Sequence, residues 1–367
     1  MIKEDILSWD EPLIFKGACN NWQVVKWKEK EWRNFLGKGE LTYPLRKGSF
    51  ECSSEPQWER KCAEEKMTMS NFLSLFFKPE EKANKNWFYF DYKHIAQWFE
   101  KNIEQLDFSW ACVGYPERTA KDSTLWIGTE GAHTPCHIDT YGCNFVAQLY
   151  GRKTWLLFNP SEIGRLRPTR VPYEESSIYS DFNFFCTCNE FPNINEGKII
   201  TLEPGDVLYV PKRWWHFVQN ESPAISVNSW IPLDSDNKSR VEESLVKLFI
   251  SNLTKNMDEE NIKTVLNPNE DDLTDFTFNY SLEELNYCLQ DAGETSKLTK
   301  SNASCLNQFT IRSRKKEEIQ NLFKSKCLKQ NELKDAVEKD TIGCKEIINA
   351  FCHPDVISLV FKQIKGT

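Results

Sequence analysis

The chain has 367 residues, of which 40% are hydrophobic, and it is rich in large rings, with 24 Phe and 13 Trp. That is enough apolar side chain for a core of ordinary size, and it suits an all-β or mixed fold with large buried rings. The formal net charge of −8 argues against a nucleic-acid groove as the main surface, because phosphate binding requires a basic footprint. We therefore expect a soluble acidic protein with no direct nucleic-acid partner.

We expect neither export nor membrane insertion. The first 17 residues contain no sustained apolar run preceded by basic residues, which is the pattern of a signal peptide. No stretch approaches the roughly 20 apolar residues of a membrane helix. The 13 cysteines include no C-x-x-C pair, so a zinc or redox motif is not indicated. We expect reduced thiols and a cytoplasmic location, with the nucleus as a further location.

The first 122 residues combine strand-like runs with one helix-like run. Short strands are expected within 11–22, 41–46 and 86–92. Residues 68–77 have a helical pattern, with Thr68 or Ser70 as the candidate N-cap. We expect residues 1–122 to form an α/β portion that packs on the region that follows.

Residues 123–233 alternate apolar runs with Pro, Gly and Asn, which is typical of a strand-rich barrel or sandwich. Clear strands are predicted at 207–210, after a Pro-Gly-Asp turn, and at 224–230. Apolar residues at helical spacing then predict an amphipathic helix over 241–257. We assign residues 123–257 to a barrel core and the helix that follows it.

A third portion, residues 258–315, is expected to be irregular. Residues 258–275 are acidic and predicted to be a loop, and a weak helix begins near Ser281. Residues 291–307 are rich in Ser, Thr, Lys and Asn, which is the composition of a flexible linker. A short basic cluster at 312–316 is interpreted as a solvated run of charge rather than a nuclear signal.

Residues 316–367 have helical periodicity and are expected to form a small C-terminal helical segment. They carry no metal-ligand or co-substrate motif, so a chain ending near Lys300 is predicted to keep its chemistry. Their apolar residues could instead pack back on the barrel or form a homodimer through these helices.

Two short segments carry the residue types of a metal site. His137 and Asp139 are two residues apart, and in an extended strand such residues point to the same face, with Ile138 pointing away. His216 comes from a separate segment, directly after two tryptophans. Two imidazoles and one carboxylate are the ligand set of a non-haem Fe(II) oxygenase. The alternative for His216 alone is a core histidine packed against those tryptophans.

The runs that contain these residues, 123–158, 168–177 and 227–233, resemble the JmjC family of Fe(II)- and 2-oxoglutarate-dependent oxygenases. The resemblance extends from about Glu11 to about Met257. It implies a mainly β fold with flanking helices, a double-stranded β-helix (the jelly-roll barrel of cupins), followed here by C-terminal helices. It also implies Fe(II), 2-oxoglutarate as co-substrate and O2. The likeness is to an animal branch associated with a small heat-shock protein, which implies such a protein as a partner.

The resemblance also assigns residues to 2-oxoglutarate. Lys153, which enters an apolar strand, matches the lysine that binds the distal carboxylate, and Thr134 and Tyr89 match a threonine and a tyrosine that reach the same group. Asn144 and Asn228 match polar residues that line the pocket, although one extra residue between Asp139 and Asn144 departs from the related pattern. A lysine at this place is costly to bury unless it meets an anion; the alternative is that it reaches solvent on its flexible stem.

His133, four residues before His137, is not expected to share the metal, and we expect a surface or hydrogen-bonding role for it. The predicted function is an active dioxygenase that hydroxylates a protein side chain and converts 2-oxoglutarate to succinate, with the protein substrate unknown. The alternatives are a non-catalytic scaffold that binds a small heat-shock protein in the stress response, a lysine demethylase, and a cupin-type metal enzyme that uses no keto acid.

Overall fold

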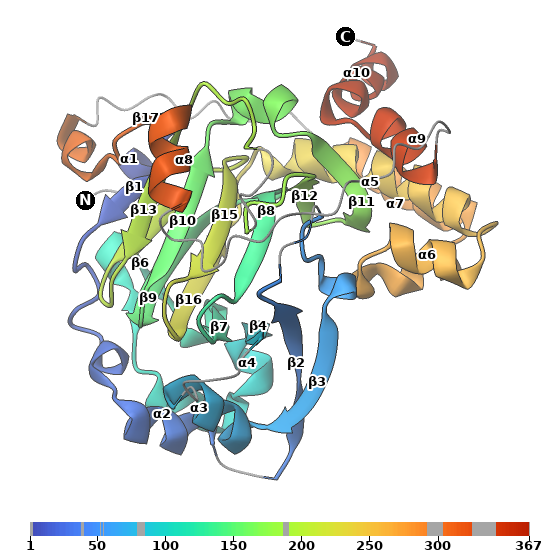
Figure 1. Ribbon diagram of the computed structural model, residues 1–367. Coiled ribbons are helices and arrows are strands. Elements are labelled where there is room, and N and C mark those ends of the chain that lie inside the picture. Colours follow the sequence, from blue (N-terminus) through green and yellow to red (C-terminus); the bar gives the residue numbers. More distant parts are fainter. Residues whose placement is uncertain are drawn as a thin grey trace.

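Two antiparallel β-sheets face each other at the centre of the molecule, and the helices lie around them (Figure 1). The structure is a computed structural model. It describes residues 3–37, 40–51, 53, 55–78, 85–185, 191–291, 304–324 and 343–366. The paired sheets with flanking helices confirm the predicted jelly-roll fold.

The larger sheet combines strands from the N-terminal portion and the predicted barrel core. Its order is β1 (Leu13–Phe15), β14 (Val207–Val210), β9 (Cys143–Tyr150), β16 (Ala224–Ile231), β7 (Thr124–Gly128), β4 (Asn86–His94), β2 (Thr42–Ser49) and β3 (Ala63–Thr68). Strands β2, β3 and β4 therefore extend the barrel sheet through the β4–β7 pairing. The predicted boundary at residue 122 falls between strands of one sheet, and the division into four portions stays a prediction.

The smaller sheet carries two of the segments singled out in the sequence. Its order is β11 (Pro168–Glu174), β12 (Ser177–Ser180), β8 (His133–Asp139), β15 (Trp215–Asn220), β10 (Lys153–Phe158), β13 (Glu196–Leu202) and β17 (Arg314–Lys315). A separate two-stranded ribbon joins β5 (Ser109–Trp110) to β6 (Tyr115–Thr119). Because β8 and β15 are neighbours, residues far apart in the chain meet at the centre of this sheet.

Strand alternation decides which side chains face the space between the sheets. On β10, Leu156 and Phe158 pack in the cluster outside the smaller sheet, whereas Trp155 and Leu157 pack in a cluster between the sheets. The cluster between the sheets consists of buried hydrophobic side chains. Successive residues of a strand point to opposite faces, so Lys153, two residues before Trp155, also points inward.

The helices cover the outer faces of both sheets. Their bounds are α1 (Lys3–Leu7), α2 (Glu29–Leu36), α3 (Met69–Phe77), α4 (Ile95–Trp98), α5 (Asp236–Thr254), α6 (Glu259–Val265), α7 (Phe278–Asp291), α8 (Lys316–Lys324), α9 (Cys344–Phe351) and α10 (Pro354–Lys365). Short 3-10 helices are η1 (Gln23–Lys26), η2 (Glu59–Lys61), η3 (Glu100–Gln105), η4 (Ala111–Val113), η5 (Ala120–Asp122), η6 (Pro160–Arg165), η7 (Pro268–Asp275) and η8 (Ser304–Phe309). Helices α2 and α3 bury Trp32, Phe35, Phe72 and Phe76 against the larger sheet. The Thr68 hydroxyl caps α3, as predicted.

Two predicted boundaries are wrong around helix α5. The helix begins at Asp236 rather than Val241, because the buried Asp236 carboxylate accepts the backbone N–H groups of Gly142 and Leu233, both at 2.9 Å, and thereby docks the helix start on the barrel. Residues 258–275 form α6 and η7 instead of a loop. Asp258 caps α6, and the buried Val265 and Leu273 hold the segment against α5 and β11.

The described residues 304–324, which span the end of the predicted linker and the start of the predicted C-terminal helical segment, pack on the barrel, and whether the chemistry needs them stays a prediction. Leu306, Ile311, Ile319 and Phe323 are buried in the cores of the barrel, and β17 pairs with β13. The apolar pattern did not reveal where these side chains pack, because their partners lie far away in the sequence. Residues 292–303, most of the predicted linker, lie outside the described residues.

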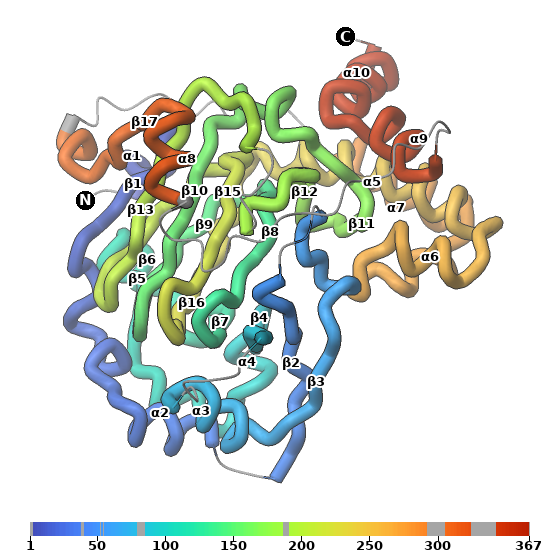
Figure 2. Tube along the Cα trace, in the orientation of Figure 1, coloured from blue at the N-terminus to red at the C-terminus, as the bar shows by residue number. Residues whose placement is uncertain are grey.

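The last helices return to the barrel beside α5 and α7, as the tube in Figure 2 shows. The Asn349 side chain on α9 accepts the backbone N–H of Arg170 at 2.8 Å, and Ile348, Cys352 and Ile357 pack with α5 and β11. One of the two alternatives for this segment, packing on the barrel, is therefore confirmed for α9 and α10. Among the described residues, no helix combines the length and apolar character needed to cross a membrane.

Candidate metal centre

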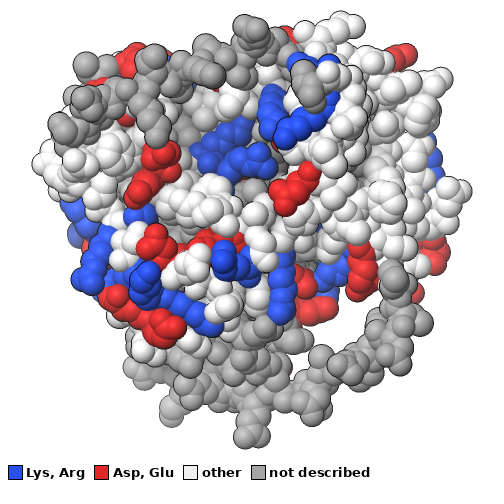
Figure 3. Space-filling view, turned by 90° about the horizontal axis from the view of Figure 1, so that it is seen from above, with Lys and Arg blue, Asp and Glu red and all other residues white. Residues whose placement is uncertain are grey.

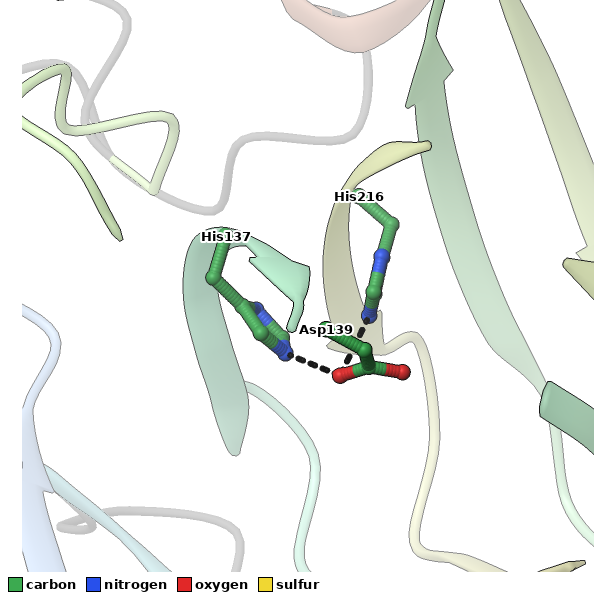
Figure 4. Close-up of side chains that lie close together, drawn as sticks. All are labelled: His137, Asp139 and His216. Atoms are coloured by element: carbon green, nitrogen blue, oxygen red, sulfur yellow. Dashed lines mark ion pairs between the residues drawn. The ribbon is translucent and has the colours of Figure 1, made fainter. Parts of the chain in front are cut away.

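His137, Asp139 and His216 converge between the two sheets (Figure 4). His137 and Asp139 end strand β8, and His216 is the direct antiparallel partner of His137 on β15. Asp139 Oδ1 lies 3.5 Å from His137 Nε2 and 3.9 Å from His216 Nε2. Ile138 points to the opposite face and packs in the outer cluster, which confirms the expected alternation. Pairing in the sheet thus completes the three-residue group that the spacing predicted.

Both imidazoles are oriented by backbone carbonyl groups. His137 Nδ1 lies 2.9 Å from Pro135 O, and His216 Nδ1 lies 2.9 Å from Trp214 O. A proton on each Nδ1 donates to these carbonyls and leaves the Nε2 lone pair for a metal. Burial, together with the nearby His137, lowers the pKa of His216 to about 4, which keeps this ring neutral. Neutral imidazole is the form that binds metal.

The carboxylate of Asp139 has one oxygen committed to the protein and one directed at the histidines. Its Oδ2 accepts from Trp230 Nε1 at 3.0 Å and from Asn144 Nδ2 at 3.3 Å. Burial alone would raise the pKa of Asp139, but in the metal-free site the neighbouring His137 and His216 imidazoles outweigh it and hold that pKa at about 2. The group is therefore ionised, and Oδ1 is the oxygen presented to a metal.

A series of hydrogen bonds between side-chain amides and indoles supports the carboxylate of Asp139. Asn228 Nδ2 donates to Asn144 Oδ1 at 2.9 Å, and Trp126 Nε1 donates to Asn228 Oδ1 at 2.7 Å. Asn144 and Asn228 line the inner cavity as the resemblance implies, and through this series they also orient Asp139. Trp126 and Trp230 were missed by the sequence analysis. The signal was available for Trp230, because it shares a strand face with Asn228 two residues before it.

Lys153, Tyr89 and Thr134 meet at the inner end of the same space. Lys153 is 2% exposed, and its Nζ donates to Tyr89 Oη at 3.2 Å. Thr134 lines the same inner cavity as Tyr89 and Lys153. No described carboxylate lies within ion-pair distance of Lys153, and burial lowers its pKa to about 7, although Asp91 opposes this. The solvent-reaching alternative for Lys153 is excluded; Arg152, at 51% side-chain exposure, is the solvated charge.

Two cavities meet at the three-residue group. An outer cavity of about 490 Å³ opens to solvent, and a smaller inner cavity of about 50 Å³ reaches Lys153 and Tyr89. His137 and Asp139 line both cavities. Three ligand atoms of the right types, with a buried ammonium group beyond them, fit Fe(II) together with a dicarboxylate.

His133 does not take part in this group. It is 1% exposed, so the expected surface role is wrong, and the expected hydrogen bond is present between its Nδ1 and Gly131 O at 3.0 Å. Its ring stacks on Phe185 with centroids 4.1 Å apart. The β8–β15 register shifts between His216 and Val218, so His133 lies on the face opposite the metal ligands and contacts Phe217 of the outer cluster, although regular alternation would place it on the same face as His137.

Comparisons with known proteins agree with this geometry. Residues 1–237 match a family model described as a cupin-like domain. The chain is 38% identical over 290 residues to "HSPB1-associated protein 1" of Homo sapiens, which covers 76% of this chain and 59% of that protein. It is 27% identical over 228 residues to "Jumonji C domain-containing protein 5" of Drosophila melanogaster, covering 60% of this chain and 54% of that protein. It is 24% identical over 225 residues to "Lysine-specific demethylase 8" of Xenopus tropicalis, covering 60% and 48%. The chain thus spans about three fifths of the length of the human relative.

Proposed function

The chain belongs to the cupin-like domain family, in its JmjC branch, and from this we propose that it is an Fe(II)- and 2-oxoglutarate-dependent oxygenase that hydroxylates a protein side chain. One observation carries the proposal. Asp139 Oδ1 and two Nε2 atoms face a cavity whose far end holds Lys153, a buried lysine without a carboxylate partner among the described residues. A non-catalytic scaffold would have no need for both features.

His137, Asp139 and His216 would hold the iron, and Lys153, with Thr134 and Tyr89, would bind the distal carboxylate of 2-oxoglutarate. When bound, the iron and 2-oxoglutarate would supply the oxygen chemistry, in which one oxygen atom of O2 enters a C–H bond of the substrate and the other enters succinate, with the C1 carboxylate of 2-oxoglutarate released as CO2. The buried ammonium of Lys153 supplies the positive charge that a carboxylate needs in an apolar barrel.

The protein contributes orientation through groups that do not touch the metal. Trp230 and Asn144 hold Asp139 Oδ2, so the carboxylate cannot rotate freely and Oδ1 stays directed at the histidines. The carbonyls of Pro135 and Trp214 select the Nδ1–H form of each ring. Such outer contacts raise ligand basicity and fix geometry.

The test is 2-oxoglutarate turnover by full-length protein loaded anaerobically with Fe(II) and then exposed to O2. We expect succinate formation that depends on both Fe(II) and 2-oxoglutarate, that rises when substrate is present, and that is lost in Lys153→Met. Binding is read independently, from Fe(II) content by elemental analysis and from 2-oxoglutarate affinity by calorimetry. Protein that binds Fe(II) but neither binds nor consumes 2-oxoglutarate would refute the proposal in favour of a cupin-type metal protein.

The printed name of the human relative supports a second proposal, that a small heat-shock protein is a binding partner of this chain. The name of the frog relative supports lysine demethylation as the alternative reaction. Experiments can distinguish each of these two proposals from hydroxylation of a protein side chain. Products are distinguished by mass spectrometry, since hydroxylation adds one oxygen atom to the peptide and demethylation removes a methyl group with release of formaldehyde. A heat-shock partner that binds wild type and the metal-free His137→Ala variant equally would support the scaffold reading.

A further inference from the structure

One row of paired residues across the smaller sheet contains both histidines of the metal group. Thr169 of β11 pairs with Tyr179 of β12, and Tyr179 pairs with His137 of β8. His137 in turn pairs with His216 of β15. The rings of Tyr179 and His137 also lie close together, with centroids 5.9 Å apart. The row therefore joins β11, the last strand on this side of the sheet, to the metal ligands at its centre.

Helix α9 closes the edge of β11 at this row. Asn349 Oδ1 accepts the backbone N–H of Arg170 at 2.8 Å, and the Thr169 hydroxyl lies 3.1 Å from the same oxygen. Figure 1 shows α9 beside this strand. Thr169 and Arg170 are only 1% and 2% exposed, so water cannot take the place of the Asn349 oxygen. A buried backbone donor without a partner is costly, and Asn349 therefore fixes where the edge of the sheet lies.

Strand β11 leaves its partner strand directly after the row. Thr169 pairs with Tyr179 and Glu174 pairs with Ser177, so the four residues 170–173 lie opposite the single residue 178. Such an insertion interrupts the hydrogen bonds of the ladder and bends the strand. Pro172, within this bulge, and Glu174, directly after it, line the outer cavity. The bulge 170–173 thus forms part of the cavity wall.

Contacts from the helical side hold the bulge in place of a strand partner. The Arg170 guanidinium forms a buried ion pair with Glu243 of α5, in which Nη1 donates to Oε1 at 3.2 Å. The backbone carbonyl of Tyr173 accepts the N–H of Asn267 at 2.9 Å. Apolar side chains of the bulge and of α9 share one buried cluster, namely Val171, Tyr173, Ile348 and Cys352. The position of this wall therefore depends on packed helices rather than on sheet pairing.

A second polar contact of α9 is more exposed. Lys345 Nζ lies 2.6 Å from Asp181 Oδ1, directly after β12, and these side chains are 35% and 37% exposed. Exposed ion pairs of this kind contribute little to stability. The contact that can fix the row is therefore the buried one made by Asn349.

We propose that Asn349 is a positioning residue for the oxygenase reaction, which acts through β11 and β12 on His137 and on the wall of the outer cavity. Metal ligands and substrate must be held within roughly 0.5 Å of the productive geometry, and the docked α9 supplies that constraint at the edge of the sheet. None of the described residues of α9 lines either cavity at the metal group. The inference rests on the proposed function and gives the C-terminal helices a part in it.

The test uses full-length protein with Co(II) in place of Fe(II), because the absorption spectrum of Co(II) responds to ligand geometry. Asn349→Leu removes the acceptor oxygen and nearly conserves the size of the side chain, whereas Asn349→Asp keeps an acceptor at the same position. We expect Asn349→Leu to alter the Co(II) spectrum and to weaken Co(II) affinity about tenfold, the lower end of the range for residues that orient metal ligands. Asn349→Asp should restore both toward the wild type.

Hydrogen exchange of the metal-free protein provides a second measurement that requires no activity. We expect faster amide exchange in residues 168–180 of Asn349→Leu, with exchange close to wild type in Asn349→Asp. Thr169→Val conserves the shape of the side chain and removes the hydroxyl that faces Asn349. It should shift the spectrum and the exchange in the same direction as Asn349→Leu.

Two control variants separate positioning from a general loss of stability. Leu285→Ala on α7 removes a buried side chain that packs against α5, away from the row. Lys345→Met removes the exposed contact of α9. Both should keep the wild-type Co(II) spectrum and affinity, although Leu285→Ala lowers the thermal unfolding midpoint. Equal spectral and affinity changes in either control would mark the effect as general loosening and overturn the inference.

An Asn349→Leu variant with wild-type spectrum, affinity and exchange would also overturn it, as would an Asn349→Asp variant that is impaired to the same extent as Asn349→Leu. If Asn349→Leu is insoluble, Thr169→Val decides, and unchanged spectrum and exchange in that variant would overturn the inference. Protein that shows the expected Co(II) response but does not bind 2-oxoglutarate would remove the proposed function alone. Protein that turns over 2-oxoglutarate equally with and without the Asn349 acceptor would remove this inference alone.

Discussion

Replacing Lys153 by Met is predicted to stabilise the protein when 2-oxoglutarate is absent and to abolish 2-oxoglutarate binding. Methionine conserves most of the volume of the lysine stem, so the barrel should not collapse or overpack. The change removes only the ammonium group, which is buried beside the Tyr89 phenol without a carboxylate among the described residues. The wild-type lysine is thus kept at the expense of stability, which is expected of a residue retained for binding.

The magnitude follows from the pKa. Burial lowers the pKa of Lys153 from 10.5 to about 7, and the difference, 10.5 − 7, is 3.5. At about 1.4 kcal/mol for each pKa unit, burying the charged form costs on the order of 5 kcal/mol. Below pH 7 the lysine is charged in both the folded and unfolded states and the full cost applies. Between pH 7 and 10.5 only the unfolded chain binds the proton, so the stability of the wild type rises with pH across this window.

The lost hydrogen bond to Tyr89 offsets about 1 kcal/mol of this gain. We therefore expect Lys153→Met to be about 4 kcal/mol more stable than wild type at pH 7, with the difference shrinking toward pH 10. The assay is urea unfolding of metal-free protein at several pH values, with equal m-values as the condition for comparison. Arg152→Met, next along the chain and half exposed, is the control and should change stability by less than about 0.5 kcal/mol. A Lys153→Met variant less stable than wild type at every pH would refute the reasoning.

Three further predictions address the rest of the site and the fold. His137→Ala combined with Asp139→Ala should abolish Fe(II) binding and leave the far-ultraviolet spectrum unchanged; metal content equal to wild type by elemental analysis would contradict this. Trp230→Phe, which removes the donor to Asp139 Oδ2, should weaken metal affinity about tenfold or more in a competition titration, whereas the exposed Trp98→Phe should not. A chain ending at Lys300 should be insoluble or should lose several kcal/mol or more of unfolding free energy in urea. The truncation removes four buried side chains from the core, those of Leu306, Ile311, Ile319 and Phe323. A soluble chain of wild-type stability would show that these contacts contribute little.

Charged side chains of both signs lie on the face of the molecule seen from above. Figure 3 shows Lys and Arg side chains mixed with Asp and Glu side chains over this face. The whole chain carries a net charge of −8, with 46 Lys and Arg against 54 Asp and Glu.

Spacing along single strands explains why so much of the site was predictable. His137 and Asp139 were expected to share a strand face, and Lys153 in an apolar strand was expected either to meet an anion in the interior or to reach solvent on its flexible stem. The strand 207–210 was predicted with its exact bounds, because a Pro-Gly-Asp turn precedes it and a proline ends it. These features are local, and elementary strand geometry is sufficient to read them.

Features that depend on contacts between distant segments were not predictable. The Asn267 amide that joins Glu59 and Glu174 comes from a segment expected to be a loop, and Trp230 meets Asp139 across the two sheets. The β4–β7 register shifts between Phe90 and Lys93, with Tyr92 at a φ of +55°, which interrupts the alternation that a sequence reading must assume. The same limit applies to 304–324, whose apolar side chains showed that it packs somewhere but not on which surface.

The sequence by itself indicated a strand-rich barrel or sandwich and placed His137 and Asp139 on one strand face, because period-two alternation acts within a few residues. The resemblance to the JmjC family added His216, the double-stranded β-helix and the role of Lys153, whose burial stayed open until the structure was known. Only the tertiary structure decided which oxygen of Asp139 faces the histidines, which rings and carboxylates line the outer cavity, and that the C-terminal segment belongs to the core. The physical reason is that sheet pairing and side-chain packing join residues 70 or more positions apart, such as His137 with His216 and Asp139 with Trp230, and no local pattern records such pairs.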